Sequence, residues 1–313
     1  MQTEEVVDVA IVGGGASGTA LLFALTRYTT LARIALLEKY GEAGSVNTQS
    51  NNNSQTLHIG DIETNYSLEK VQSVAPAASM IPHYTAMLRA EEQARILFPV
   101  HKMVLGIGSE EVAKLEQRYE QIKSVFPKLM KLDRTEIASV EPKVIEGRSA
   151  DVPVLALAQW GHAVDFKELA QSFVNQTLAR TDAKRRVQVH FNAAVADVIR
   201  TADGMWRLTF GTKSITARVV IFDADAYSLT FAKRLGYGKE FSLIPVAGTF
   251  FFSKQILNGK VYMVQEPRLP FAAIHGDPDV RVPNKTRWGP TARFFPVLEA
   301  RNSKTTRDYF AVS

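Results

Sequence analysis

The stretch that most constrains the fold lies near the N-terminus, where a short apolar run, residues 8–12, passes into glycines and then into a helix-forming segment. The three spaced glycines have separate uses in such a turn. Gly13 permits the tight turn out of a strand, Gly15 lets the backbone approach a pyrophosphate, and Gly18 lets the next helix pack closely on the strand. The free N–H groups at the start of that helix would face the phosphates. The stretch therefore predicts a dinucleotide-binding βαβ unit.

A second apolar run, residues 33–37, ends in Glu38, 20 residues beyond Gly18. A carboxylate at this point suits the two hydroxyls of a ribose. A glycine-rich turn alone is weak evidence. The order strand, glycines, helix, strand and acid within about 30 residues favours dinucleotide binding over an ordinary βαβ turn. Glu38 does not choose between FAD and NAD, because both carry the same ribose diol, but it disfavours the 2′-phosphate of NADP.

The composition is that of an ordinary globular protein. With 313 residues, 46% of them hydrophobic, the chain can bury a large core as two domains or as one fold with insertions. The absence of cysteine excludes disulfides, thiolate metal sites and a cysteinyl flavin link, and it fits a reducing cytoplasm. No apolar run is long enough to span a membrane. The net charge of +5 comes from scattered basic residues, and we expect neither a metal site nor a nucleic-acid partner.

Residues 41–61 form a long polar stretch that is rich in Asn, Ser, Gly and Gln. Such a sequence does not make a core helix or strand. A loop of this length inside a compact domain is usually either functional or disordered. Its place directly after the second strand, on the side where a cofactor would lie, favours function, and it also supplies His58.

The rest of the chain predicts further helices and strands by periodicity. Helices are expected over residues 80–97, 110–126 and 165–178. Strands are expected over residues 102–108, 187–191, 195–200, 206–210, 219–222, 243–252 and 260–264. His190 alternates with the apolar residues of its strand and is expected at a surface or edge.

His275 and Asp277 stand two apart at the end of an apolar run. Side chains two apart on a strand point the same way, so they could handle a proton together. The alternative is a simple turn, because residues 276–279, Gly-Asp-Pro-Asp, have strong turn chemistry.

Taken together, these stretches resemble FAD-dependent malate:quinone oxidoreductases. That family lies within the flavoprotein oxidoreductases that also include 2-hydroxyglutarate dehydrogenases and glycine or D-amino-acid oxidases. The glycine turn is generic to flavoproteins, whereas the other matching stretches are more specific. They are Asn-Asn-Ser-Gln-Thr-Leu-His at 52–58, Glu-Thr-Asn-Tyr at 63–66, Glu-Pro-Lys-Val-Ile-Glu-Gly-Arg at 141–148, His-Gly-Asp at 275–277 and Gly-Pro-Thr-Ala at 289–292.

The resemblance implies an α/β fold with a discontinuous Rossmann-type FAD-binding domain of the glutathione-reductase and D-amino-acid-oxidase kind. An α+β substrate domain would be inserted into it. We place the FAD-binding domain at residues 1–78 and 160–238 and the substrate domain at 79–159 and 239–313. Family chains continue past the position of residue 313, so the substrate domain is expected to be C-terminally incomplete here.

The implied reaction is the oxidation of (S)-malate to oxaloacetate, with electrons passed from the flavin to a membrane quinone. The resemblance also implies a cytoplasmic protein that associates peripherally with the inner face of the cell membrane. Its implied catalytic residues are His275 as proton acceptor, Asp277 as its support, and His58. Glu63 would line the same pocket.

The remaining candidate residues fall into two groups. Candidates for substrate binding are Asn53, Asn65, Tyr66, Lys102, Arg287 and Arg293. Candidates for cofactor binding are Gly13, Gly15, Ala16, Ser17, Gly18, Glu38, Lys39, Asn52, Thr56, Val195 and Ala224. The cations are included because a dicarboxylate needs cationic partners.

One segment departs from the family pattern. Relatives carry a small-residue turn ending in Gly where this chain has Ala226, and Asp223 and Asp225 flank Ala224. The contact with FAD is expected to be altered there.

Two alternatives stay open at this point. One is an FAD-dependent dehydrogenase or oxidase of another 2-hydroxy acid or amino acid, because the fold and cofactor are shared and a few side chains set the substrate. The other is an inactive, shortened flavoprotein-like protein. An NAD-dependent dehydrogenase is disfavoured by the Asn-rich loop.

Overall fold

The computed structural model describes residues 6–181, 185–266, 273–299 and 302–312. The chain divides into two compact units. Unit 1 comprises residues 1–54, 166–245 and 294–313, and unit 2 comprises residues 55–165 and 246–293. The sequence predicted domain boundaries after residues 78, 159 and 238. In the structure, residues 55–78 belong to unit 2 and residues 294–313 belong to unit 1.

Unit 1 is built on a sheet with the strand order β6-β2-β1-β9-β8-β7. Its strands are β1 (Val6–Val12), β2 (Arg33–Leu37), β6 (Arg186–His190), β7 (Val195–Arg200), β8 (Trp206–Phe210) and β9 (Lys213–Phe222). Its helices are α1 (Ala16–Tyr28), α7 (Phe166–Leu178), α8 (Tyr227–Arg234), the 3-10 helix η1 (Ser303–Thr305) and α9 (Thr306–Val312).

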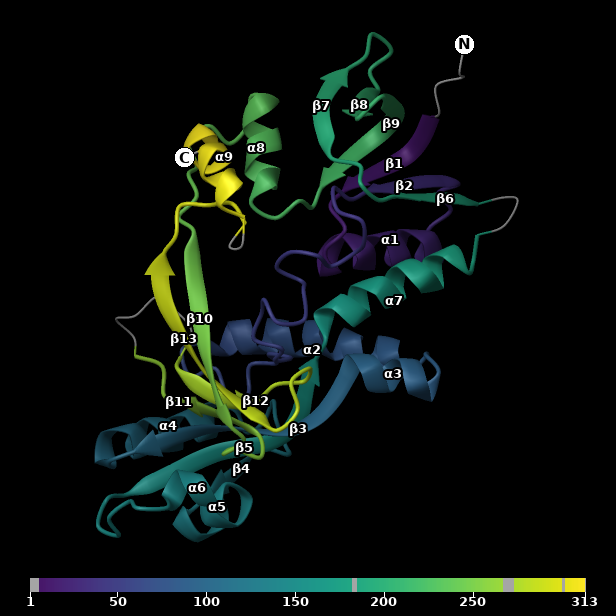
Figure 1. The fold of residues 1–313 in the computed structure, drawn as a ribbon. Coiled ribbons are helices and arrows are strands. Elements are labelled where there is room, and N and C mark those ends of the chain that lie inside the picture. The colour runs from purple at the N-terminus through teal and green to yellow at the C-terminus, as the bar shows by residue number, and fades with distance from the viewer. Residues whose placement is uncertain (1–5, 182–184, 267–272, 300–301, 313) are drawn as a thin grey trace. The chain divides into compact units, whose positions relative to one another are not determined.

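β1 lies at the centre of this sheet, parallel to both β2 and β9. Its nearly unbroken apolar sequence suits a strand that is covered on both faces. On one face, α1 and α7 lie side by side (Figure 1), and Leu22 of α1 is fully buried against Ile11 and Ile34 of the sheet. His190 ends the edge strand β6, as expected from its alternation. This is the predicted Rossmann-type arrangement.

Unit 2 holds a sheet with the strand order β10-β13-β12-β11-β3-β5-β4. Its strands are β3 (Leu97–Ile107), β4 (Met130–Leu132), β5 (Val154–Val164), β10 (Val246–Lys254), β11 (Lys260–Met263), β12 (His275–Pro278) and β13 (Lys285–Phe294). Its helices are α2 (Leu68–Thr85), α3 (Ala90–Ile96), α4 (Ser109–Ile122), α5 (Arg134–Val140) and α6 (Pro142–Ile145).

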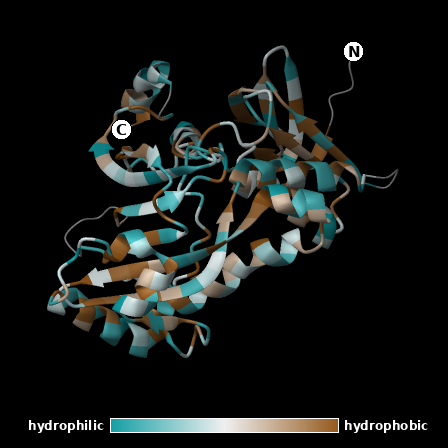
Figure 2. Ribbon diagram, turned by 60° about the horizontal axis from the view of Figure 1, so that its bottom comes forward, coloured by the Kyte–Doolittle hydropathy of each residue, from teal (hydrophilic) through white to brown (hydrophobic). Residues whose placement is uncertain are grey.

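Successive side chains of β3 point to opposite faces of the sheet, so the core of unit 2 forms two layers. Val104 packs with Leu115 of α4, whereas Met103 on the opposite face packs with Ile137 of α5. Figure 2 shows the corresponding pattern, with hydrophobic colour along the strands and hydrophilic colour on the outer helix surfaces. Lys102 lies on the same face as Val104, because it is two residues away on the strand. This places a lysine inside the apolar layer.

Several predicted elements need correction. The expected helix over 80–97 is wrong, because α2 ends at Thr85, α3 ends at Ile96, and Leu97 begins β3. Pro76 and Pro82 lie inside α2. Because proline disfavours the interior of a helix, the sequence did not predict a helix that begins at Leu68. Residues 276–278, the alternative turn, belong to strand β12. The start of the apolar run before His275, residues 269–272, lies outside the described residues.

The polar stretch 41–61 forms no helix or regular strand, as predicted. Its amides hold it in shape. Asn52 donates to the carbonyl of Val46 at 2.8 Å, and Asn53 donates to the carbonyls of Asn47 and Gln49. Within the described parts of the chain, no helix has both the length and the apolar character needed to cross a membrane.

Candidate functional site

The glycine turn of unit 1 packs closely against the segment that follows β9. Gly13 has φ +121°, and a Cβ placed on it would lie 2.0 Å from the carbonyl oxygen of Asp223. Only glycine is tolerated there. Gly15 is the N-cap of α1 and supplies no side-chain cap, so N–H groups of the first turn are directed toward a ligand. One of them, at Ala16, donates to the hydroxyl of Thr48 at 3.0 Å.

Glu38 anchors the end of β2 beside this turn. One carboxylate oxygen accepts from the N–H of Gly14 at 2.7 Å, and the other accepts from the N–H of Tyr40 at 2.8 Å. A carboxylate has about four acceptor positions, so two remain for a ribose diol. The donors and acceptors of the turn, the helix and Glu38 together fit an adenosine diphosphate group such as that of FAD.

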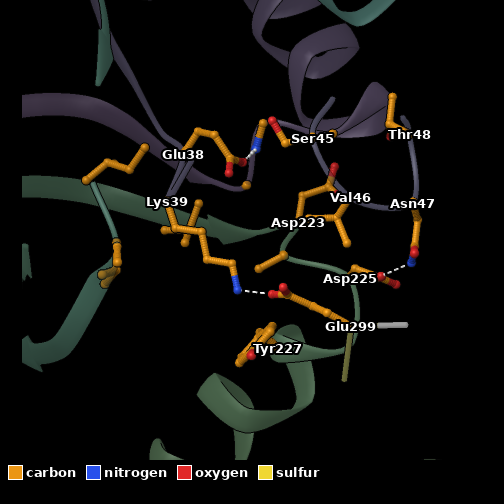
Figure 3. Close-up of a pocket in the computed structure, with 18 of the residues that line it drawn as sticks. Glu38, Lys39, Ser45, Val46, Asn47, Thr48, Asp223, Asp225, Tyr227 and Glu299 are labelled. Carbon is orange, nitrogen blue, oxygen red and sulfur yellow. Dashed lines mark hydrogen bonds and ion pairs between the residues drawn. The ribbon is translucent and has the colours of Figure 1, made fainter. Parts of the chain in front are cut away.

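A cavity of about 360 Å³ lies over the turn (Figure 3). Among the predicted cofactor-binding residues, its lining includes Gly13, Gly15, Glu38, Lys39, Val195 and Ala224. Ala16, Ser17 and Gly18 form the start of α1. Asn52 supports the loop, and Thr56 lies in unit 2, where its hydroxyl hydrogen-bonds the Tyr262 hydroxyl at 2.7 Å.

The pocket also contains acids that were not among the predicted site residues. Glu299 pairs with Lys39 and accepts from the Tyr40 hydroxyl, as the sticks in Figure 3 show for Lys39. Burial opposes ionisation of Glu299, but the hydrogen bonds from Lys39 and Tyr40 outweigh it and lower the pKa of Glu299. Burial and the bond to Glu299 raise the pKa of Tyr40 to about 12.

The segment after β9 brings two more carboxylates to the pocket. Asp223 accepts from the Ser17 hydroxyl at 2.5 Å, and Asp225 accepts from Asn47. The residue in the left-handed region is Asp225, with φ +51°, whereas Ala226 has an ordinary helical φ of −55°. The left-handed backbone of this turn is therefore at Asp225, and the expected change of the FAD contact at Ala226 stays a prediction.

Unit 2 brings polar residues from five strands into one row. The strand register places Gln159 opposite Lys102, Lys102 opposite Lys260, and Asp277 opposite Arg287. The Val261–Gly276 pairing sets Lys260 beside Asp277. All five side chains therefore share one face of the sheet.

The cations of this row are paired inside the protein. Lys102, fully buried, bonds Asp61 at 2.9 Å, and Gln159 bonds the same carboxylate at 2.6 Å. Asp277 accepts from Lys260 and, at 2.7 Å, from Arg287. These pairs hold Lys102 and Arg287 in the sheet, and their predicted roles in substrate binding stay predictions.

Burial controls the ionisation of this row. Desolvation lowers the pKa of Lys260 to about 8, although Asp277 opposes the shift. Burial also disfavours the charged form of Asp277, but the attraction of Lys260 and Arg287 wins and lowers its pKa. Asp277 makes its hydrogen bonds to these two cations.

His275 lies in the next row, opposite Tyr262. Its Nδ1 is 3.0 Å from the carbonyl of Ala273, which fixes Nδ1 as the protonated nitrogen and Nε2 as the acceptor. Nε2 is buried and has no hydrogen-bond partner among the described residues. Burial lowers the pKa of His275 to about 4, so the ring is neutral at physiological pH. The lone pair of Nε2 is therefore available to accept a proton, although burial makes the protonated ring costly.

A second candidate, His58, also contacts the Tyr262 ring. His58, whose ring is edge-on to Tyr262 with 6.1 Å between centroids, pairs through Nδ1 with Glu63. The bond from His58 and the charge of Lys102 overcome burial and lower the pKa of Glu63. The other oxygen of Glu63, Oε2, is buried without a partner among the described residues. Nε2 of His275 and Oε2 of Glu63 are thus two buried acceptors without a hydrogen-bond partner among the described residues.

The other predicted substrate residues are dispersed. Asn53 belongs to unit 1, and Asn65 and Arg293 are exposed in unit 2. The Tyr66 ring stacks under Lys70, 4.0 Å from the ammonium nitrogen. Residues that the sequence did not single out are Thr48, Asp61, Gln159, Lys260, Tyr262 and Glu299. They carry no local motif, and their roles follow only from strand pairing or from the return of the C-terminal segment.

Comparison with known proteins decides the family. A family model described as Malate:quinone oxidoreductase (Mqo) matches residues 5–288. The chain belongs to the malate:quinone oxidoreductase family. Its curated relatives include a probable malate:quinone oxidoreductase from Campylobacter jejuni, 38% identical over 98% of this chain, and the malate:quinone oxidoreductase of Helicobacter pylori, 37% identical over 93%. The chain covers 70% and 65% of those two relatives, respectively. The resemblance drawn from the sequence is confirmed.

Solved structures confirm the fold class. Glycine oxidase from Geobacillus kaustophilus has a TM-score of 0.66 at 19% identity, over 93% of this chain and 72% of its own. The FAD-bound L-alpha-glycerophosphate oxidase from Mycoplasma pneumoniae has a TM-score of 0.68 at 18% identity, over 98% of this chain and 78% of its own. At these identities the likeness concerns the fold alone. Together with the family it makes FAD the cofactor for which the pocket of unit 1 is suited.

Proposed function

We propose that this chain carries out the FAD-dependent oxidation of (S)-malate to oxaloacetate and passes the electrons to a membrane quinone. The observation that carries the proposal is the family match over residues 5–288. The pocket of unit 1 supports it through the acceptor positions of Glu38 and the free first turn of α1. Bound FAD would supply the acceptor for the hydride from substrate C2.

In this proposal unit 2 supplies the proton chemistry. His275 Nε2 accepts the hydroxyl proton of the substrate, because its lone pair is unused and Nδ1 is held by Ala273. His58, with Glu63 on its Nδ1, is the second candidate for the same role, since a carboxylate on one nitrogen stabilises the imidazolium. Asp277 accepts hydrogen bonds from Lys260 and Arg287 and balances their charge. Its described hydrogen bonds do not include one to His275.

The quinone acceptor places the protein at a membrane. We propose peripheral association with the inner face of the cell membrane, because quinones are dissolved in the lipid phase and the chain carries a net charge of +5, which favours anionic headgroups.

Anaerobic reduction of the flavin tests the proposal. The purified protein, loaded with FAD, should bleach with malate and regain its yellow colour with a quinone analogue. Bleaching by 2-hydroxyglutarate or glycine in place of malate would favour another substrate of the same chemistry. Failure to bleach with any of them would contradict the proposed function.

Variants separate the two histidines. His275→Gln should abolish bleaching by malate while the protein retains FAD, and His58→Gln should do so only if His58 is the acceptor. His83→Gln, an exposed residue on α2, is the matched control and should bleach normally. Near-normal turnover of His275→Gln would rule out His275 as the proton acceptor.

A further inference from the structure

The pocket of unit 1 has an unusual charge for a site that receives a pyrophosphate. Its described lining includes five acids, Glu38, Asp223, Asp225, Glu299 and Asp308. Lys39 is the only basic residue in that described lining, and it is already paired with Glu299. A dianionic ligand therefore meets an excess of negative charge.

Asp223 lies where an anion is most stabilised. Its Oδ2 accepts from Ser17 in the first turn of α1, and a Cβ placed on Gly18 would be 3.6 Å from the same oxygen. The first turn of a helix attracts negative charge through its free N–H groups and its dipole. The Asp223 carboxylate thus lies beside the helix N-terminus that would otherwise stabilise the pyrophosphate.

Asp225 adds a second carboxylate on the same segment. It is bonded to Asn47 of the loop that borders the cavity, as Figure 3 shows, and it is held in the left-handed region at φ +51°. Burial, with the nearby charges of Asp223 and Glu299, raises the pKa of Asp225. Ionisation of this group is already disfavoured in the pocket, and a bound pyrophosphate would disfavour it further.

We propose that the carboxylates of Asp223 and Asp225 compete with the FAD pyrophosphate for the N-terminus of α1, so that this chain binds FAD weakly at neutral pH and more tightly when these carboxylates are neutralised. This inference rests on FAD being the ligand of the pocket. The other ionisable groups that face the segment are Glu38 and Lys39 from the end of β2, Tyr227 from α8, and Glu299 and Asp308 from the C-terminal segment.

The test is the dissociation constant of FAD, measured on the full chain by quenching of flavin fluorescence. Asp223→Asn and Asp225→Asn should each lower the Kd by about tenfold or more, because each removes one like charge next to the pyrophosphate. Asn also tolerates the left-handed backbone of Asp225, so this substitution changes charge without adding strain. Asp203→Asn, in the exposed turn between β7 and β8, is the matched control and should leave the Kd unchanged.

The pH dependence of the Kd gives a second readout, which begins with the wild-type chain. The Kd of the wild-type chain should fall as the pH is lowered and Asp225 is protonated, because burial and the charges of Asp223 and Glu299 raise the pKa of Asp225. The double variant should lose most of this dependence. An unchanged Kd in both Asn variants, or an equal pH dependence in the double variant, would overturn the inference and leave the proposed function standing. A chain that binds no FAD in any form at any pH would overturn both.

Discussion

The ring of Tyr262 lies nearly parallel to the imidazole of His275, with 4.2 Å between centroids and 19° between planes. The pairing of β11 with β12 sets these residues opposite each other, and Phe250 closes over the imidazole at 5.4 Å. This enclosure explains why His275 is 3% exposed and neutral, because the cost of burying its charge outweighs the stabilisation of the charged form by the Ala273 carbonyl and by Asp277.

The first prediction concerns stability at low pH. An unfolded histidine titrates near pH 6.5 and His275 in the folded chain at about 4, so the unfolded state binds more protons between these values. The stability that neutral His275 confers is complete above about pH 6.5 and is lost as the pH falls through about 4. The loss should reach about 3 kcal/mol.

Urea unfolding of the wild type and of His275→Gln from about pH 7 to about pH 4 measures this. The variant should lose less stability than the wild type over the range, whereas His83→Gln should follow the wild type. Parallel curves for all three proteins would show that His275 titrates normally.

The second prediction concerns the hydroxyl of Tyr262. It shares a hydrogen bond of 2.7 Å with Thr56, and both residues are buried. Tyr262→Phe should lower the free energy of unfolding by about 1–2 kcal/mol, because the buried hydrogen bond between the two hydroxyls is lost. The ring stack on His275 survives, so bleaching by malate should be retained. A double-mutant cycle with Thr56→Val checks the assignment, and additive effects would contradict a direct bond.

The sequence predicted unit 1 better than unit 2, for a physical reason. The glycine turn and Glu38, which the sequence singled out, lie within one βαβ unit, and each has a local stereochemical cause. The row in unit 2 joins Lys102, Lys260 and Arg287, whose proximity depends on the register of strands far apart in the chain. No local pattern encodes that register, so the sequence did not single out Lys260 and did not predict the pair between Lys102 and Asp61.

The acids of the pocket were predicted in part. The sequence singled out Asp223 and Asp225 because they depart from a small-residue turn. It could not show that Asp223 bonds Ser17 of α1, nor that Glu299 of the C-terminal segment pairs with Lys39.

The third prediction tests whether Lys102 is structural. Lys102→Met should cost about 3–5 kcal/mol, because it leaves the buried carboxylate of Asp61 without its cation. The matched control is Lys114→Met, which breaks the exposed pair with Glu110 on α4 and should leave stability nearly unchanged. Urea unfolding distinguishes the two variants. A small loss for Lys102→Met would mean that Asp61 is neutralised by another group, and the lysine would then be available for substrate.

The fourth prediction concerns the contact between the glycine turn and the segment after β9. Gly13→Ala should destabilise the chain by about 3 kcal/mol or more, because the new Cβ would meet the carbonyl of Asp223 at 2.0 Å and the backbone stands at φ +121°. Gly211→Ala is the matched control. Its backbone also has a positive φ, +55°, but no atom lies within 4 Å of the added Cβ, so only about 1 kcal/mol should be lost. Thermal unfolding compares the two variants, and FAD titration reports on the pocket. Because both variants introduce the same methyl group, equal losses of stability would show that backbone strain alone, and not the close approach of Asp223, makes glycine necessary at position 13.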